Sequence, residues 1–298
     1  MVSYIQDSHD DGAQCLQRDH IEWTEEQKAA ALARVAEQVN RELNPDEERI
    51  LHHNEEAAAY WNAFYEKHES KFFKERSWLP IEFPELFQDH GDAPQTFVEL
   101  GSGPGASIFP ILQANANPNL TLYALDFSPC ALSLIEQHPQ FDPSRCRTLQ
   151  HDLTQPIPLP DDSVDIFLAT FVLSAIAPHQ FPETLRSIYR ALKPGGLLLF
   201  RDYGRHDMTQ LRFKPTRRLG DDFYVRGDGT QVFFFDHNEL ASLAKEIGFS
   251  ILQNAVDRRL LLNRAKQKEM YRIWLQCKYQ KPLWGWDQWG IRRHSIRI

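Results

Sequence analysis

Phe97-Val-Glu-Leu-Gly-Ser-Gly-Pro-Gly105 joins an apolar strand to a loop that holds three glycines. Because Gly101, Gly103 and Gly105 carry no side chain, backbone N–H groups and a ligand can approach each other closely there. We take Gly101 and Gly103 as candidate contacts of that ligand. Dinucleotide-binding folds use a similar loop, so the glycines alone predict only a nucleotide-type cofactor.

The residues around this loop alternate short β-rich runs with helical runs. We expect strands at residues 97–100, 121–126, 147–151, 164–170, 197–202, 250–256 and 270–278. Helices are expected near residues 105–115, 129–138, 180–192 and 238–247. Such alternation favours a mostly parallel sheet covered on both faces. The predicted fold class is therefore α/β, with a seven-stranded, mostly parallel sheet and helices on both faces.

The chain divides into three parts. Residues 1–95 are expected to form a helical extension, residues 96–282 the α/β domain and residues 283–298 a tail. Within the α/β domain, residues 203–237 form a long connection where a compact fold needs only a short loop. Such insertions tend to be functional.

Two helices are expected in the N-terminal extension. The capping box Thr24-Glu-Glu-Gln27 begins a helix that runs to Val39. The N-cap and proline in Asn44-Pro45-Asp46 begin a second helix, which should reach about His68.

Composition excludes several classes of protein. With 298 residues and 42% hydrophobic content, the chain can bury one large core. It has no apolar run of membrane-spanning length, and its first residues resemble neither a signal peptide nor a transit peptide. We therefore expect a cytoplasmic protein without a membrane segment, and a nuclear pool is left open. The cysteines, Cys15, Cys130, Cys146 and Cys277, form no CxxC pair, so no metal site is expected.

Charge is distributed unevenly along the chain. The net charge is -8, yet residues 201–298 hold 19 Lys and Arg against 11 Asp and Glu. Residues 1–200 hold 14 against 30. A basic final third on an acidic protein predicts an anionic partner.

Three carboxylates lie at or near the ends of successive expected strands. Glu99, just before the glycine loop, can meet the ammonium group of a methionine-like moiety, whereas a dinucleotide would place anionic phosphates there. Asp126, with Phe127 beside it, can accept both ribose hydroxyls. Asp152 can accept from the adenine amino group, and the Leu153 N–H can donate to the ring. Together they predict S-adenosylmethionine as cofactor and S-adenosylhomocysteine as product.

Several blocks of sequence extend this interpretation. Residues 158–165 and 192–200 resemble the class I, Rossmann-like methyltransferase superfamily. Other blocks resemble the eukaryotic tRNA 3-methylcytidine methyltransferases of the methyltransferase-like group, and they are residues 20–27, 60–65, 72–76, 126–129, 171–175, 200–204, 224–230 and 257–259. This resemblance spans about residues 20–282. It implies methylation of N3 of the cytidine at position 32 in the anticodon loop of threonine or serine tRNAs.

Trp61 and Tyr65 are four residues apart, so they share one helix face. The resemblance implies that they cover the cofactor, so that the extension both covers the pocket and helps to bind tRNA. It assigns further cofactor contacts to Gly101, Asp126, Asp152, Leu153 and Thr170. The family often has an aliphatic residue where this chain has Thr170. The alternative for Trp61 and Tyr65 is that they only pack on the sheet.

The chemistry predicts a small set of residues around the target base. Cytosine N3 has an in-plane lone pair and needs no general base, so the rate should come from alignment with the methyl group. Asp202 is the candidate that stabilises the positive charge of the product base. The alternative is that Asp202 is only a strand-end carboxylate paired with Arg201. Tyr203 or Phe72 is the candidate for stacking on a splayed base.

Two basic insertions, residues 203–237 and 257–269, are expected to face the tRNA backbone. Their candidate RNA-binding residues are Arg212, Lys214, Arg217, Arg218, Arg226, Arg258, Arg259, Arg264 and Lys266, with Lys268. A protein partner such as an aminoacyl-tRNA synthetase is left open.

Two other functions remain open from the sequence. One is an S-adenosylmethionine-dependent methyltransferase of a small molecule or protein, for which the basic insertions would be dispensable. The other is a cofactor-binding RNA subunit without activity of its own.

Overall fold

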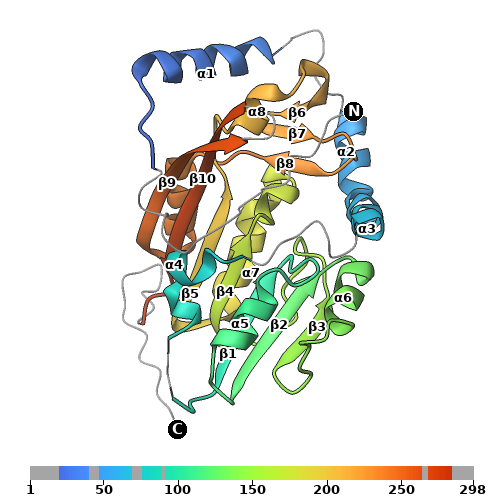
Figure 1. Ribbon diagram of the computed structural model, residues 1–298, viewed down its shortest axis with the longest axis vertical. Coiled ribbons are helices and arrows are strands. Elements are labelled where there is room, and N and C mark those ends of the chain that lie inside the picture. Colours follow the sequence, from blue (N-terminus) through green and yellow to red (C-terminus); the bar gives the residue numbers. More distant parts are fainter. Residues whose placement is uncertain (1–19, 40–46, 69–75, 89–90, 264–267, 284–298) are drawn as a thin grey trace.

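The computed structural model describes residues 20–39, 47–68, 76–88, 91–263 and 268–283, and its centre is a seven-stranded sheet (Figure 1). The strand order is β3-β2-β1-β4-β5-β10-β9. The bounds are β1 (Gln95–Leu100), β2 (Leu120–Asp126), β3 (Cys146–Gln150), β4 (Val164–Thr170), β5 (Leu192–Tyr203), β9 (Ser250–Asn263) and β10 (Lys268–Gln280). β10 is the strand that runs opposite to the rest of this sheet, and it pairs antiparallel with both β5 and β9. The predicted fold class is confirmed.

Alternate residues of the central strands are buried on opposite faces of the sheet. Val98, Phe167 and Leu198 pack under α7 (Phe181–Ala191) and α9 (His237–Ile247). Phe97, Ile166 and Leu199 pack on the other face, under the helices α4 (Leu79–Glu82), η3 (Pro84–Leu86), α5 (Ile108–Ala114) and α6 (Pro129–Glu136). The central strands carry apolar side chains on both faces, so each face of the sheet needs a layer of helices that excludes water. The order of the strands reverses between β1 and β4, which opens a crevice at their carboxyl ends.

The N-terminal extension differs from its prediction in one respect. Helix α1 (Glu25–Glu37) begins at the Thr24 capping box, as expected. The second predicted helix is two helices, α2 (Glu47–Glu55) and α3 (Ala57–His68), which are separated at Glu56. They pack on different partners: Ile50 of α2 contacts a small three-stranded sheet, and α3 packs on α6. The predicted N-cap at residues 44–46 lies outside the described residues, as do residues 284–298 of the predicted tail.

The predicted connection 203–237 is a folded unit rather than a plain loop. It holds α8 (Met208–Arg212), η6 (Pro215–Arg217) and an antiparallel sheet, here called the small sheet, of β6 (Arg218–Gly220), β7 (Phe223–Val225) and β8 (Gln231–Phe233). Aromatic residues expected as loop side chains form its core, since Phe213 stacks on Tyr224 with ring centroids 4.8 Å apart. Residues 257–263 and 268–269 are also not an insertion, because they extend the β9–β10 ladder. The extra sequence length at both places adds paired strands.

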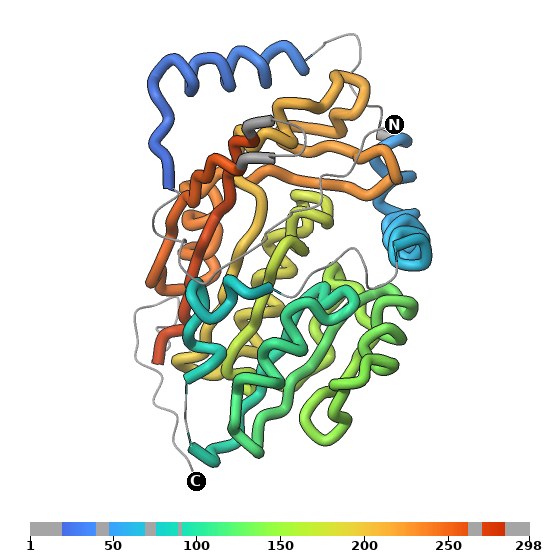
Figure 2. Tube along the Cα trace, viewed as in Figure 1, coloured from blue at the N-terminus to red at the C-terminus, as the bar shows by residue number. Residues whose placement is uncertain are grey.

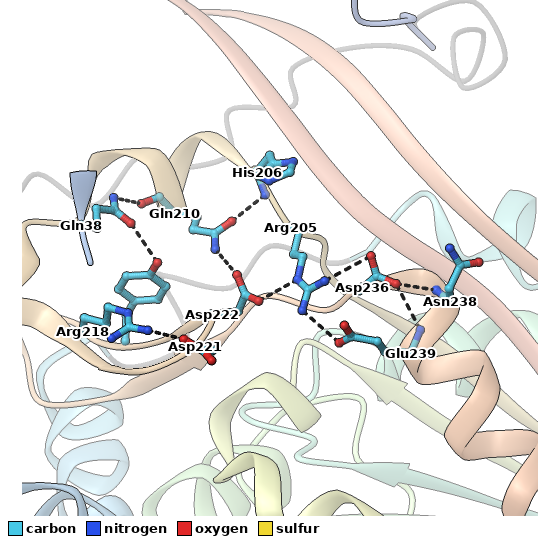
Figure 3. Close-up of polar contacts among 11 residues, drawn as sticks. Gln38, Arg205, His206, Gln210, Arg218, Asp221, Asp222, Asp236, Asn238 and Glu239 are labelled. Atoms are coloured by element: carbon cyan, nitrogen blue, oxygen red, sulfur yellow. Dashed lines mark hydrogen bonds and ion pairs between the residues drawn. The ribbon is translucent and has the colours of Figure 1, made fainter. Parts of the chain in front are cut away.

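Helix α1 lies beside this folded unit (Figure 2). It is attached to the unit through the buried side chain of Gln38 (Figure 3). The Gln38 side-chain amide donates to the carbonyl oxygens of Gln210 (2.9 Å) and Phe213 (3.0 Å). Its oxygen accepts a hydrogen bond from the Tyr224 hydroxyl at 2.8 Å. Gln210 in turn donates to Asp222, whose other oxygen accepts from Arg205. The network fixes α1, α8 and the small sheet relative to one another.

We predict that Gln38→Ala loosens α1 from α8 and the small sheet. Gln38 is 1% exposed. Its loss leaves the carbonyl oxygens of Gln210 and Phe213 and the hydroxyl of Tyr224 without this hydrogen-bond partner. Unsatisfied buried groups cost about 1–3 kcal/mol, so the free energy of unfolding should fall by that order. Hydrogen exchange of the α1 amides should accelerate more than that of β1. Tyr224→Phe, which removes one of the three bonds, is the graded control, and equal exchange in all three proteins would contradict the role of Gln38.

Candidate cofactor pocket and RNA-facing surface

Seven of the predicted cofactor residues line one cavity. It lies at the carboxyl ends of the strands, beneath α2 and α3. The predicted residues in its wall are Trp61, Tyr65, Gly101, Asp126, Phe127, Asp152 and Leu153. Because these residues come from α3 and from the ends of β1, β2 and β3, the structure places them at the expected crevice. Their contact with a cofactor stays a prediction.

Glycine is required at positions 101 and 103 because other side chains pack closely against the backbone there. Gly101 has φ +59°, and a Cβ there would collide with the side chain of Val172, just beyond β4. Gly103 has φ +53° and lies under the ring of Tyr65. Both positions combine a backbone conformation that favours glycine with a close approach. Gly101 therefore stays open toward the cavity, while Gly103 is covered by Tyr65.

Asp126 has two tasks. One carboxylate oxygen accepts the N–H of Gly103 and the other accepts the N–H of Ser128, each at 2.9 Å. The side chain thus fixes the glycine loop and the start of α6, and it also lines the cavity. Burial raises its pKa to about 6, while the backbone N–H bonds act in the opposite direction. These bonds hold the carboxylate at the position predicted for ribose recognition.

The aromatic residues of α3 cover the cavity from the extension. The rings of Trp61 and Tyr65 lie 5.9 Å apart, and Phe64 packs beside them against Ala131. Asn62 accepts a hydrogen bond from the Ser128 hydroxyl at 2.9 Å, which ties α3 to the start of α6. The helix is therefore positioned by the α/β domain itself, and its aromatic face lies over the pocket.

Glu99 is a buried carboxylate without a partner. It is 1% exposed, and neither of its side-chain oxygens has a hydrogen bond. The hydroxyls of Ser107 and Thr170 are buried beside it, and their polarity lowers the pKa of the carboxyl group. Burial raises the pKa of Glu99 to about 7, and the positive charge of Arg76 opposes this rise. An ammonium group would satisfy this carboxylate, as the sequence predicted.

Thr170 and Gly103 are not part of the cavity wall, and neither is Glu99. The Thr170 hydroxyl lies beside Glu99 instead, and its contact with the cofactor stays a prediction. Phe171, the next residue, does line the cavity. Its φ of +55° is unusual for an aromatic residue and turns the chain away from β4.

Sequence reasoning missed several residues of the wall. Asn54 and Ala58 enter it from α2 and α3, and Gln231 enters it from β8. Gln231 donates to Asn54 at 2.9 Å across 177 positions of sequence. No local pattern could reveal this pair. Also missed were Val172, Ala175, Ile176, Gln180, His151 and Thr154.

The structure changes the role of Asp202. Its side chain is fully buried, and its oxygens accept the backbone N–H groups of Ser174 (2.9 Å) and Tyr203 (2.8 Å). It therefore holds the turn η4 (Leu173–Ala175), which ends in the cavity wall, and it does not line the cavity itself. Asp202 therefore has a positioning role at this turn, and its predicted charge-stabilising role stays a prediction. The alternative pairing with Arg201 is wrong, because Arg201 pairs with Asp257 at 2.7 Å.

Tyr203 lies near the cavity without lining it. Its ring is 5.1 Å from that of Phe171, which does line the cavity. The guanidinium carbons of Arg226 and Arg272 lie 5.7 and 5.8 Å from the Tyr203 ring. The predicted stacking residue is therefore part of an aromatic and cationic group beside the pocket, and its contact with a base stays a prediction.

The predicted RNA-binding cations fall into different environments. Arg212, Lys214 and Arg217 are exposed on or beside α8 and η6. Arg258 is half-buried, Arg218 pairs with Asp221, and Arg226 donates to the Gln231 carbonyl oxygen. Arg264 and Lys266 lie outside the described residues.

Arg259 was predicted to bind RNA, but the structure buries its side chain. It is 6% exposed, and its guanidinium bridges Asp257 (2.7 Å) and Glu82 (3.0 Å). Because its guanidinium is buried in these two ion pairs, Arg259 is not available to phosphates in this structure. Arg258 and Arg259 are adjacent in the sequence, yet only Arg259 is buried. Neighbouring residues on a strand point to opposite faces, and the sequence does not say which face is covered.

Comparisons with known proteins agree with this geometry. A family model described as a methyltransferase domain matches residues 98–198. The zebrafish tRNA N(3)-cytidine methyltransferase METTL2 is 44% identical over 89% of this chain and 84% of its own length. The fission yeast tRNA N(3)-methylcytidine methyltransferase trm140 is 42% identical over 88% of this chain and 86% of its own.

The chain belongs to the tRNA N(3)-cytidine methyltransferase family. Among solved structures, a Haloferax volcanii methyltransferase in complex with the activator Trm112 covers 77% of this chain and 97% of its own, with a TM-score of 0.55. At 18% identity it supports the fold alone. Membership of this family makes the protein an S-adenosylmethionine-dependent methyltransferase, and the glycine loop, Asp126 and the unpaired Glu99 fit that cofactor. None of the helices in the described ranges is long and apolar enough to cross a membrane.

We predict that Glu99→Gln removes part of the pH dependence of stability in the cofactor-free protein. Below about pH 4.5 the carboxyl group is protonated in both the folded and unfolded chains and has no effect. Between about pH 4.5 and 7 the unfolded chain loses this proton first, so the free energy of unfolding falls as the pH rises. At about 1.4 kcal/mol per pKa unit, the full effect is about 3 kcal/mol.

Urea denaturation at several pH values across this window measures the effect. Asp126 and Asp202 titrate there too, with pKa values of about 6, but they are common to both proteins. The difference between wild type and variant therefore isolates Glu99. Parallel stability profiles would show that Glu99 is not an unpaired buried carboxylate.

Proposed function

We propose that this chain transfers a methyl group from S-adenosylmethionine to N3 of a cytidine in tRNA. The proposed target is position 32 of the anticodon loop in threonine or serine tRNAs, and the proposed place of action is the cytoplasm. The observation that carries the proposal is the extent of the match to relatives with this activity in their names. It spans 88–89% of the chain and so includes the extension and the small sheet as well as the cofactor pocket.

The pocket suits a reaction that needs alignment more than acid or base catalysis. The cofactor supplies a methyl group on a positively charged sulfur. The residues of this chain hold the adenosine end at Asp126 and Asp152 and the methionine end near Glu99. Phe171 and Tyr203 offer ring faces beside the pocket, where a splayed base can stack. Because N3 of cytosine already carries a lone pair, placing it in line with the methyl group is enough to account for the reaction.

The position of the exposed cations supports RNA as the substrate. Arg212, Lys214 and Arg217, here called the α8–η6 cations, lie on the unit that carries the small sheet. This unit reaches the pocket directly, because Gln231 of β8 lines the wall. It also contacts α2, since Arg49 donates to the Thr216 carbonyl oxygen at 2.7 Å. A strand of RNA bound at these cations would therefore lie beside the cavity.

The test of the proposed function is methyl transfer from labelled cofactor to total tRNA, followed by nucleoside analysis. We expect label in 3-methylcytidine, and sequencing of the modified tRNAs should locate it at position 32. Label in another nucleoside, or in protein or small molecules only, would contradict the proposal. Binding of tRNA without any transfer under saturating cofactor would favour an RNA-binding subunit, and an aminoacyl-tRNA synthetase should then be tested as partner.

We predict that reversing the three α8–η6 cations to glutamate weakens tRNA binding. Each lost phosphate contact lowers the slope of log affinity against log salt by about 0.7 to 0.9, so three contacts should flatten it by about 2. Filter binding across a range of salt concentrations measures both effects. The matched control reverses three exposed cations elsewhere, namely Arg147, Arg186 and Lys245. Equal weakening in both triple variants would show a net-charge effect without a local RNA surface.

A further inference from the structure

A hydrogen bond between Asn54 and Gln231 joins two distant parts of the chain in the wall of the cavity. The Gln231 side-chain amide donates to the Asn54 side-chain oxygen at 2.9 Å, and both residues line the cavity. Asn54 belongs to α2, whereas Gln231, which is 2% exposed, begins β8 of the small sheet. Neither residue comes from the strand ends that carry the predicted cofactor contacts. The bond therefore connects the extension to the small sheet beside the cofactor pocket.

Helices α2 and α3, here called the cover, pack on the small sheet at further points. Ile50 of α2 packs in the apolar core of that sheet. The ring of Tyr60 in α3 lies directly on Gly229, where an added Cβ would be 2.3 Å from a ring carbon. The same two helices bring Trp61 and Tyr65 into the cavity wall. The small sheet and the cofactor pocket thus share one cover.

A series of hydrogen bonds leads from an exposed cation to Asn54. Arg217, one of the α8–η6 cations, donates to the Arg226 carbonyl oxygen at 3.4 Å. The Arg226 guanidinium donates to the Gln231 carbonyl oxygen at 3.0 Å, and the Gln231 side chain then donates to Asn54. The Arg226 backbone N–H donates to the Thr230 carbonyl oxygen at 2.8 Å, which closes the turn between β7 and β8. A ligand that fixes Arg217 would therefore restrain the turn that carries Gln231.

We propose that the Asn54–Gln231 bond couples the binding of RNA to the binding of the cofactor. RNA held at the α8–η6 cations restrains the small sheet, the bond passes this restraint to the cover, and the closed cover retains the cofactor. The closed state is the one in this structure, and in the open state the bond is broken and the cover leaves the small sheet. Asn54 and Gln231 are positioning residues in this scheme.

Coupling between two ligands is reciprocal, so the cofactor should retain RNA by the same factor. The inference rests on the tRNA substrate of the proposed function. It adds the contact through which that substrate acts on the cofactor.

The test is the rate at which S-adenosylhomocysteine leaves the full chain, with and without saturating tRNA. Radiolabelled ligand is displaced by an excess of unlabelled ligand, and the tRNA is an unmodified transcript with cytidine at position 32. The variants are Asn54→Ala, Gln231→Ala and the double variant. Asn54→Gln combined with Gln231→Asn exchanges the two side chains and keeps their summed length. The matched control is Asn62→Ala, which loosens the same cover at its bond to the Ser128 hydroxyl and leaves the small sheet untouched.

We expect tRNA to slow release from the wild type, and the ratio of the two rates measures the coupling. Loss of one neutral hydrogen bond should lower this ratio by about 2- to 10-fold in either alanine variant. The double variant should lose no more, because both substitutions remove the same bond. The exchanged pair should recover part of the ratio. Asn62→Ala should speed release in both conditions and keep the ratio.

Two results would overturn the inference. One is a wild-type release rate that saturating tRNA does not change. The other is an equal ratio in the wild type and in Asn54→Ala, which would show that the pair only supports the cover, as Asn62 does.

These outcomes are separate from the test of the proposed function. Methyl transfer to tRNA with an equal ratio in all variants keeps the function and removes the coupling. A tRNA that slows release through Asn54 and Gln231 but accepts no methyl group keeps the coupling and removes the function.

Discussion

The close approach between the glycine loop and the residues after β4 is the constraint on which the pocket depends. β1 and β4 are neighbours, and their chains leave the sheet in different directions at the point where strand order reverses. Only a residue without a side chain fits at Gly101, because Val172 occupies the adjacent space. Asp126 then ties the loop from β2 through the N–H of Gly103. The crevice stays open because backbone, and not side chains, forms this part of its wall.

Buried charge is the second feature that shapes the molecule. On the far side of β5, Arg201 and Arg259 share Asp257, and Arg259 also reaches Glu82. Trp274 lies 4.9 Å from the guanidinium carbon of Arg201. This fully paired group fixes the segment around α4 against the sheet, whereas Glu99 on β1 stays unpaired. The contrast separates charges that are paired within the fold from a buried carboxylate that is not.

Helices α2 and α3, which are separated at Glu56, link the cofactor pocket to the small sheet. α3 contributes Trp61 and Tyr65 to the cofactor pocket, while α2 packs on the small sheet and bonds to it through Asn54 and Gln231. The extension therefore packs on both the cofactor pocket and the small sheet and does not stand apart as a separate domain. Any movement of the small sheet on binding RNA would act on the same helices that cover the cofactor.

The sequence by itself determined the strands of the central sheet, the capped start of α1 and the acidic residues at the strand ends, because these depend on local periodicity and on the residue types that end each strand. It could not determine that Arg259 is buried beside the half-exposed Arg258, that Asp202 holds a turn, or that residues 203–237 form a sheet with its own core. The Asn54–Gln231 pair was likewise decided by the tertiary structure. Each depends on which distant segments pack together, and that packing sets burial, pairing and charge.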